Sequence, residues 1–221
     1  MIEYLLEPFS YDFMVKAIWA CTLVGGLCAY LSCYLVLKGW SLIGDALAHA
    51  IVPGVALAYL LSLPYSIGSF FAGFLAVLSM TAIKIFTKLR EDTVIGMIFT
   101  SFLALGLVIA SFSPVSVNIE EIILGNILGI SDYDILQVIV ISIICFTAIT
   151  LKWKDIFLVF FDESYAESIG INIIYIKILF FTLLTASIVA ALQAVGASLV
   201  IALIITPGST AYLLTDKFNK L

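Results

Sequence analysis

Residues 44–54 read GDALAHAIVPG and place an acid and an imidazole inside an otherwise apolar stretch. His49 is the only histidine of the chain, and Asp45 lies four residues before it. Residues four apart share one face of a helix, so the carboxylate and the imidazole point the same way. Pro53 cannot donate the hydrogen bond that the His49 carbonyl normally accepts. The stretch therefore predicts a helix kinked at Pro53, with a free carbonyl near the pair.

The composition predicts an all-α, polytopic transmembrane helical bundle. The 221 residues are 63% hydrophobic and 11% charged, whereas soluble domains carry about 25% charged residues. The alternating segments of a membrane barrel are absent from the sequence, and so is a basic patch for nucleic acid. Four cysteines lie in apolar runs without a CxxC pair, and we expect packing residues instead of thiolate ligands.

Apolar runs predict about seven spans in a single transmembrane domain, residues 1–221. The predicted spans are Phe13–Leu37, Ser41–Ser62, Ser66–Thr87, Val94–Phe112, Ile135–Leu151, Ile173–Leu192 and Val195–Leu214. Lys38 and Trp40 are predicted to anchor the membrane interface. Residues 113–134 predict a short interfacial or re-entrant helix. Pro207, in Thr206-Pro207-Gly208, is predicted to break or bend the last span.

The distribution of basic residues predicts that the amino terminus lies outside. This orientation puts Lys38, Lys88, Arg90, Lys152, Lys154, Lys217 and Lys220 in the cytoplasm. It also makes the stretch from Asp155 to Asn172 a cytoplasmic connection. Counting along the second span then places Asp45 only a turn or two from the cytoplasmic end of its helix.

Three interpretations of Asp45 and His49 remain open: a packing pair, a proton relay and a divalent-metal site. Hydrogen bonds in membranes average about 0.6 kcal/mol, less than the roughly 2.5–3.5 kcal/mol that a central aspartate costs. Packing alone therefore explains the pair poorly. Carboxylate oxygen suits Mn²⁺, and imidazole suits Fe²⁺ and Zn²⁺. Since two ligands cannot hold a dehydrated ion, the metal hypothesis implies a second copy of the chain across a two-fold axis.

The cytoplasmic connection contains a short amphipathic helix over residues 162–171. Asp162 or Ser164 can cap it and Gly170 can end it. It is either an ordinary connecting helix or a docking helix for a cytoplasmic partner. Near the outer ends of the last two spans, Gln193 and Gly196 either line the pathway or cap helix ends.

The sequence has no G-x-x-x-x-G-K-[ST] loop, so it predicts no ATPase or other enzyme activity. If transport is ATP-driven, the ATPase must be another chain. An ion-gradient-driven metal carrier, a siderophore- or vitamin-type permease and a non-transporting scaffold are the alternatives.

Several long motifs resemble the permease subunits of metal ABC importers, the family that takes up manganese, zinc and iron. They are LKGWSLIGDALAHAIVPGVALAY, KLREDTVIGMIFTSFLALGL, FFDESYAESIGIN and LQAVGASLVIALIITPGSTAYLLTD, which together span nearly the whole chain. The amino-acid sequence of residues 99–107 and 125–129 resembles the manganese/iron branch of the family more than the zinc branch.

The resemblance implies a multi-pass protein of the bacterial cytoplasmic (inner) membrane. It implies two permease chains in a homodimer, a cytoplasmic ABC ATPase dimer and an extracellular metal-binding protein. The transported Mn²⁺, Fe²⁺ or Zn²⁺ is the substrate, with no permanently bound cofactor. Asp45 and His49 match the family's metal site, and Asp162, Glu163, Ala166 and Gly170 its ATPase-coupling segment. Because members typically continue beyond the LLTD block, the resemblance implies that a final span is lacking here.

Overall fold

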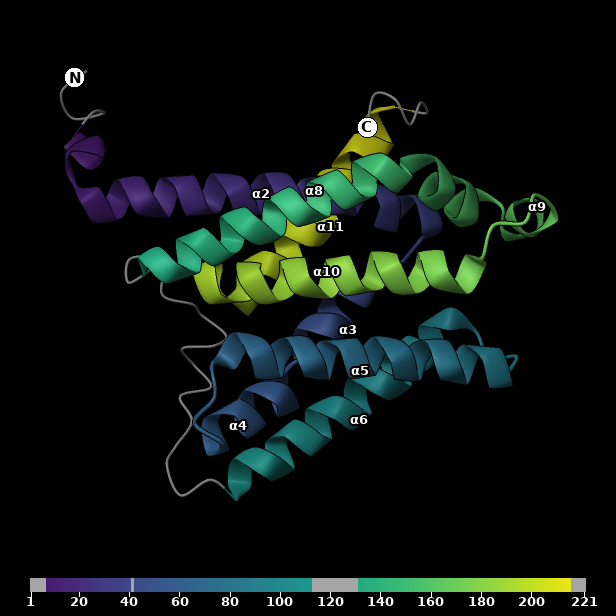
Figure 1. Cartoon of the computed structure of the whole chain (residues 1–221), viewed down its shortest axis with the longest axis horizontal. Coiled ribbons are helices and arrows are strands. Elements are labelled where there is room, and N and C mark those ends of the chain that lie inside the picture. The colour runs from purple at the N-terminus through teal and green to yellow at the C-terminus, as the bar shows by residue number, and fades with distance from the viewer. Residues whose placement is uncertain (1–6, 41, 113–130, 216–221) are drawn as a thin grey trace.

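The computed structural model describes residues 7–40, 42–112 and 131–215, and every regular element in these ranges is a helix (Figure 1). In chain order the elements are η1 Glu7–Ser10, α2 Asp12–Lys38, α3 Ile43–Ala50, α4 Val52–Leu60, α5 Tyr65–Phe86, α6 Glu91–Ser111, α8 Asp132–Phe161, α9 Glu163–Ser168, α10 Ile173–Val195 and α11 Ala197–Leu214. Seven spans are long and apolar enough to cross a membrane when α3 and α4 are taken together. The predicted all-α polytopic bundle is confirmed.

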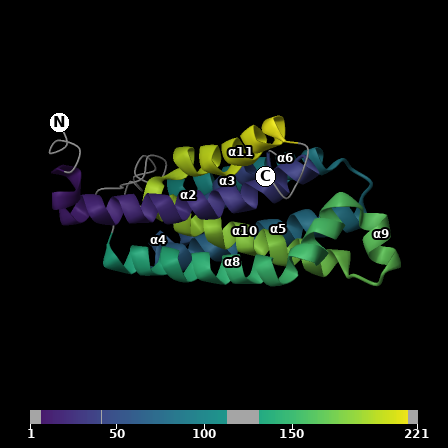
Figure 2. The same ribbon diagram turned by 90° about the horizontal axis from the view of Figure 1, so that it is seen from above.

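The long helices run roughly along one axis (Figures 1 and 2). In Figure 1, α2, α8 and α10 lie on one side of the bundle, and α4, α5 and α6 lie on the other. Both views place α3 near the middle of the long axis, and α9 projects at the end opposite the amino terminus. We call the end that carries α9 the inner end and the opposite end the outer end. The chain thus holds α3, the helix that carries Asp45 and His49, near the middle of the bundle.

Helices α4 and α5 approach each other through two glycines. A Cβ added to Gly54 would lie 2.1 Å from the Gly68 carbonyl oxygen, and one added to Gly68 would lie 2.3 Å from the Gly54 carbonyl oxygen. Small residues permit such close approach between helices in lipid. Since the obstructing atoms are backbone atoms, a side chain at either position would push the helices apart.

The fifth span is longer than the sequence predicts. Helix α8 begins with a capping box at Ser131 and continues to Phe161, whereas the prediction ended it at Leu151. At about 1.5 Å per residue it measures about 45 Å, more than the roughly 30 Å of a bilayer core. The helix therefore continues ten residues past Leu151, where the apolar run ends. The predicted connection from Asp155 is helical over its first part.

Helix α11 runs continuously through Pro207, so the predicted break is absent, while the alternative of a bend stays a prediction. The side chain of Ser32, on α2, supports the backbone here. Its hydroxyl donates to the Ile205 carbonyl over 3.3 Å and accepts the Gly208 N–H over 2.9 Å. A neighbouring helix thus stabilises the backbone beside the proline.

Part of the predicted re-entrant helix, residues 113–130, lies outside the described residues, as do Ser41, Lys217 and Lys220.

Candidate functional site

Asp45 and His49 lie on the one incompletely buried stripe of α3. The other six residues of this helix are buried, whereas the side chains of Asp45 and His49 are 41% and 34% exposed. The Asp45 Oδ1 and His49 Nε2 atoms are 3.4 Å apart. The helix therefore presents one acid and one imidazole together at the surface of this chain.

The surroundings of α3 fix how the pair is presented. On the buried side, Gly44 packs so closely on α11 that an added Cβ would lie 2.8 Å from Ile204 Cγ2. On the α6 side, the ring of Phe99 meets the imidazole of His49 edge to face, with centroids 5.3 Å apart. Asp45 lies in the first turn of α3, as counting from Ser41 predicts, and Figure 1 places this helix near the middle of the long axis of the bundle.

The helix break lies two residues before Pro53. Helix α3 ends at Ala50 and α4 begins at Val52, with Pro53 in the first turn of α4. The Ile51 N–H turns toward the His49 carbonyl, but across only two residues it does not make a regular helical hydrogen bond, so the expected free carbonyl stays a prediction. The Ile51 carbonyl instead accepts two N–H groups, from Gly54 over 2.9 Å and from Val55 over 3.1 Å.

One chain offers too few ligands to enclose a dehydrated divalent ion. Among the described residues there is no group of three or more His, Cys, Asp or Glu side chains that could hold a metal. Two of the cysteines, Cys28 and Cys145, are buried in the core. A metal site at Asp45 and His49 would thus have to draw ligands from outside the described part of this chain.

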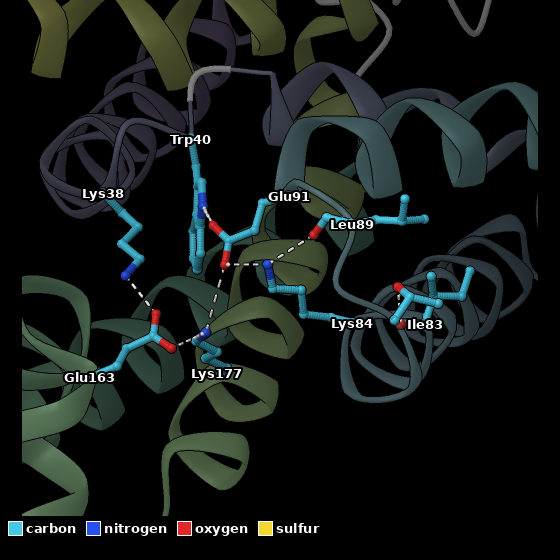
Figure 3. Close-up of polar contacts among 9 residues, drawn as sticks. Lys38, Trp40, Ile83, Lys84, Leu89, Glu91, Glu163 and Lys177 are labelled. Carbon is cyan, nitrogen blue, oxygen red and sulfur yellow. Dashed lines mark hydrogen bonds and ion pairs between the residues drawn. The ribbon is translucent and has the colours of Figure 1, made fainter.

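A second polar cluster, near the inner end, was not foreseen from the sequence (Figure 3). Glu163, the first residue of α9, accepts hydrogen bonds from Lys38 over 2.6 Å and from Lys177 over 2.9 Å. Lys177 Nζ also lies 3.9 Å from Glu91 Oε1, which is 3.8 Å from Lys84 Nζ. We call these residues, together with Trp40, the inner-end network.

Burial raises the pKa of the Glu163 carboxyl, but hydrogen bonds from Lys38 and Lys177 outweigh it, and the net pKa lies below its usual value. The carboxylate therefore stays ionised at neutral and mildly acidic pH. The network joins the ends of five helices: α2, α5, α6, α9 and α10.

Trp40 is part of this network and is not the predicted interfacial anchor. Its side chain is 5% exposed and packs against Phe160 and Phe181, with ring centroids 5.2 Å and 5.0 Å away. Its indole N–H donates to Glu91 Oε2. A buried tryptophan needs such an acceptor, and no local pattern indicates that a residue 51 positions away supplies it.

The residues predicted to contact an ATPase have roles inside the chain. The Asp162 carboxylate caps α9 by accepting the Tyr165 N–H over 3.0 Å, and Ala166 is fully buried. Gly170, at φ +88°, donates to the Glu167 carbonyl. This left-handed closing turn favours glycine.

Asp162 and Gly170 are also exposed, so their predicted contact with an ATPase stays a prediction. Other residues enlarge this exposed surface. Tyr165 and Ile169, one turn apart, are 54% and 55% exposed, and Glu167 beside them is also exposed. The spacing of Tyr165 and Ile169 in the sequence could have predicted this shared exposed face, since residues four apart lie on one side of a helix.

Gln193 does not cap a helix, and its side chain forms hydrogen bonds with two other helices. It accepts from Gln137 over 3.1 Å and donates to Ser66 over 2.8 Å, and Ser66 donates to Gln137 over 3.1 Å. This closed ring ties α5, α8 and α10 together near the outer end. Gly196, at φ +81°, makes the turn between α10 and α11.

Comparison with known proteins agrees with this architecture. The model of the ABC 3 transport family matches residues 10–221. The chain is 60% identical to the chelated iron transport system membrane protein YfeC of Yersinia pestis, over 100% of this chain and 75% of that one. It is 47% identical to the manganese transport system membrane protein MntB of Synechocystis, over 99% of this chain and 72% of that one.

A solved structure has the same fold. PsaBC from Streptococcus pneumoniae, determined in complex with Fab, superposes with a TM-score of 0.85 and 33% identity, covering 100% of this chain and 80% of that chain. The family match, the two relatives and this structure each involve nearly all of the chain. This membrane-spanning chain therefore belongs to the ABC 3 transport family.

Proposed function

We propose that this chain is the permease subunit of an ATP-driven importer of divalent manganese or iron in the bacterial inner membrane. The ion passes between two permease chains at Asp45 and His49. The observation that carries this proposal is the acid–imidazole pair, half exposed on a mid-bundle helix that is otherwise buried. An intramembrane ionisable residue marks an ion pathway by default.

A second copy of the chain supplies the missing ligands. Two α3 helices facing each other across a two-fold axis bring together two carboxylates and two imidazoles. This oxygen–nitrogen set suits Mn²⁺, Fe²⁺ and Zn²⁺. Relatives named for iron and manganese transport, at 60% and 47% identity, favour the first two ions.

The remaining partners follow from the family. A separate cytoplasmic ATPase hydrolyses ATP and docks on α9, where Tyr165 and Ile169 provide exposed apolar anchors. An extracellular metal-binding protein delivers the ion to the outer end. The four ligands hold the ion loosely enough for it to leave, and movement of the helices opens the inner side.

A reconstituted uptake assay tests the proposal. The permease, its ATPase and its binding protein are placed in vesicles, and uptake of Mn²⁺ is measured in competition with Fe²⁺ and Zn²⁺. We expect ATP-dependent uptake of Mn²⁺ that Fe²⁺ inhibits. Uptake that needs an ion gradient and no ATP would identify a gradient-driven carrier instead. Uptake only of a metal chelate would identify a siderophore-type permease.

A further inference from the structure

We propose that the inner-end network is a relay in which Lys177 exchanges carboxylate partners and so links α9 to the helices that hold the Asp45–His49 pair. This inference rests on the proposed function and deepens it, because it assigns positioning residues to the coupling between ATPase and metal site.

Lys177 lies between two carboxylates from different elements. Its Nζ is 2.9 Å from Glu163 Oε2, on α9, and 3.9 Å from Glu91 Oε1, at the start of α6. Its side chain is only 15% exposed, so water screens both interactions poorly. A displacement of α9 by about an ångström is enough to make Glu91 the closer partner, since ion-pair energy falls with distance.

Space for this exchange is present beside the network. A cavity of about 240 Å³ is lined by Trp40, Lys84, Glu91, Glu163 and Lys177, together with apolar side chains. Each carboxylate also keeps a further basic partner, Lys38 for Glu163 and Lys84 for Glu91. Neither carboxylate is therefore left unpaired when Lys177 moves, which makes both arrangements accessible.

From Glu91 two paths lead to the pair. Along α6, Phe99 lies eight residues after Glu91, about two turns away, and its ring contacts the imidazole of His49. The second path uses Trp40, whose indole N–H binds Glu91 and which lies three residues before α3 begins. Movement of Glu91 thus reaches both the helix that carries the pair and the ring that holds His49.

The orientation of Glu163 separates the relay from the docking surface. Both carboxylate oxygens of Glu163 are directed to lysines of this chain, whereas Tyr165 and Ile169 face outward from the same helix. An ATPase thus moves α9 through the outward residues, and Glu163 passes the movement inward.

The test compares Lys177→Met with Lys152→Met in the full transporter. Lys152 pairs with Asp155 over 3.1 Å at an exposed site on α8, so it is a matched lysine outside the network. Three quantities are measured: co-purification of the ATPase, the maximal rate of metal-dependent ATP hydrolysis, and the metal concentration at half-maximal rate. We expect Lys177→Met to lower the maximal rate about tenfold, a usual size for coupling between sites. ATPase co-purification and half-maximal concentration should stay at wild-type values, as all three quantities should in Lys152→Met.

Two further variants keep the test decisive. Lys177→Arg retains the charge and should restore most of the rate. Trp40→Phe keeps a buried aromatic ring but loses the N–H together with part of the indole, and it should also lower the maximal rate. A Lys177→Met complex that turns over like Lys152→Met, or that loses its ATPase, overturns the relay. A wild-type complex without metal-dependent turnover overturns the proposed function itself.

Discussion

The mid-bundle pair and the inner-end network both contain ionisable side chains, but they are partnered in opposite ways. Asp45 and His49 are half exposed on one stripe and have only each other as charged partners within hydrogen-bonding range among the described residues. In the network, each carboxylate has at least two partners from other parts of the chain. This difference supports the proposal that groups from outside the chain complete the pair, whereas the network is already paired within the chain.

The largest expected effect follows from removing either member of the pair. Asp45→Ala or His49→Ala should lower metal uptake by roughly 100-fold or more, since even outer-shell partners of metal ligands change affinity 10- to 100-fold. Vesicle uptake of Mn²⁺ measures the effect, and Leu57→Ala, an exposed apolar residue on α4, is the control. Wild-type uptake in both variants would reduce the pair to a packing feature.

The next effect concerns the close packing of α4 against α5. Gly54→Ala should destabilise the protein by about 1–3 kcal/mol, because overpacking here meets the backbone of α5. Thermal unfolding in detergent measures it. Gly96→Ala is the matched control: its added Cβ meets nothing within 4 Å, so the variant should be neutral or gain up to about 1 kcal/mol. Equal stability of the two variants contradicts the close approach of α4 and α5.

A smaller effect separates the outward face of α9 from the network. Tyr165→Ala should weaken ATPase binding by about tenfold, the effect of losing an exposed aromatic anchor of ordinary strength. A pull-down titration with purified ATPase measures it. Tyr133→Ala, an exposed tyrosine at the outer end, should bind normally. If Tyr165→Ala also binds normally, the docking surface lies elsewhere.

The smallest effect is expected at an ion pair outside both regions. Asp155→Asn removes the exposed contact with Lys152 and should change stability by less than about 1 kcal/mol, as usual for surface pairs. The same thermal assay measures it. A larger loss would show that exposure is a poor guide to which ion pairs matter in this chain.

The sequence predicts local features of this fold well and long-range contacts poorly. The seven spans can be predicted because each apolar run must cover a membrane. The Asp162 cap and the Gly170 turn can be predicted because their contacts span only a few residues. The length of α8 cannot be predicted in this way, because a helix can continue past the apolar run into water. The burial of Trp40 and the inward direction of Glu163 depend on partners 51 and 125 residues away, which no local pattern reveals.

The candidate site shows the same division. The spacing of Asp45 and His49 predicts their shared face, and the structure has both on one stripe of α3. Their depth in the bundle and the contact with Phe99 depend on how α3 and α6 pack. The sequence therefore identifies the candidate ligands and leaves their surroundings to the structure.

The most direct measurement is the amount of Mn²⁺ bound at equilibrium by the assembled transporter without ATP, in wild type and in Asp45→Asn. A site shared between facing α3 helices predicts one Mn²⁺ per two permease chains in wild type and none at this site in the variant. One ion per chain, or the same binding in both proteins, would contradict a shared site built from Asp45 and His49.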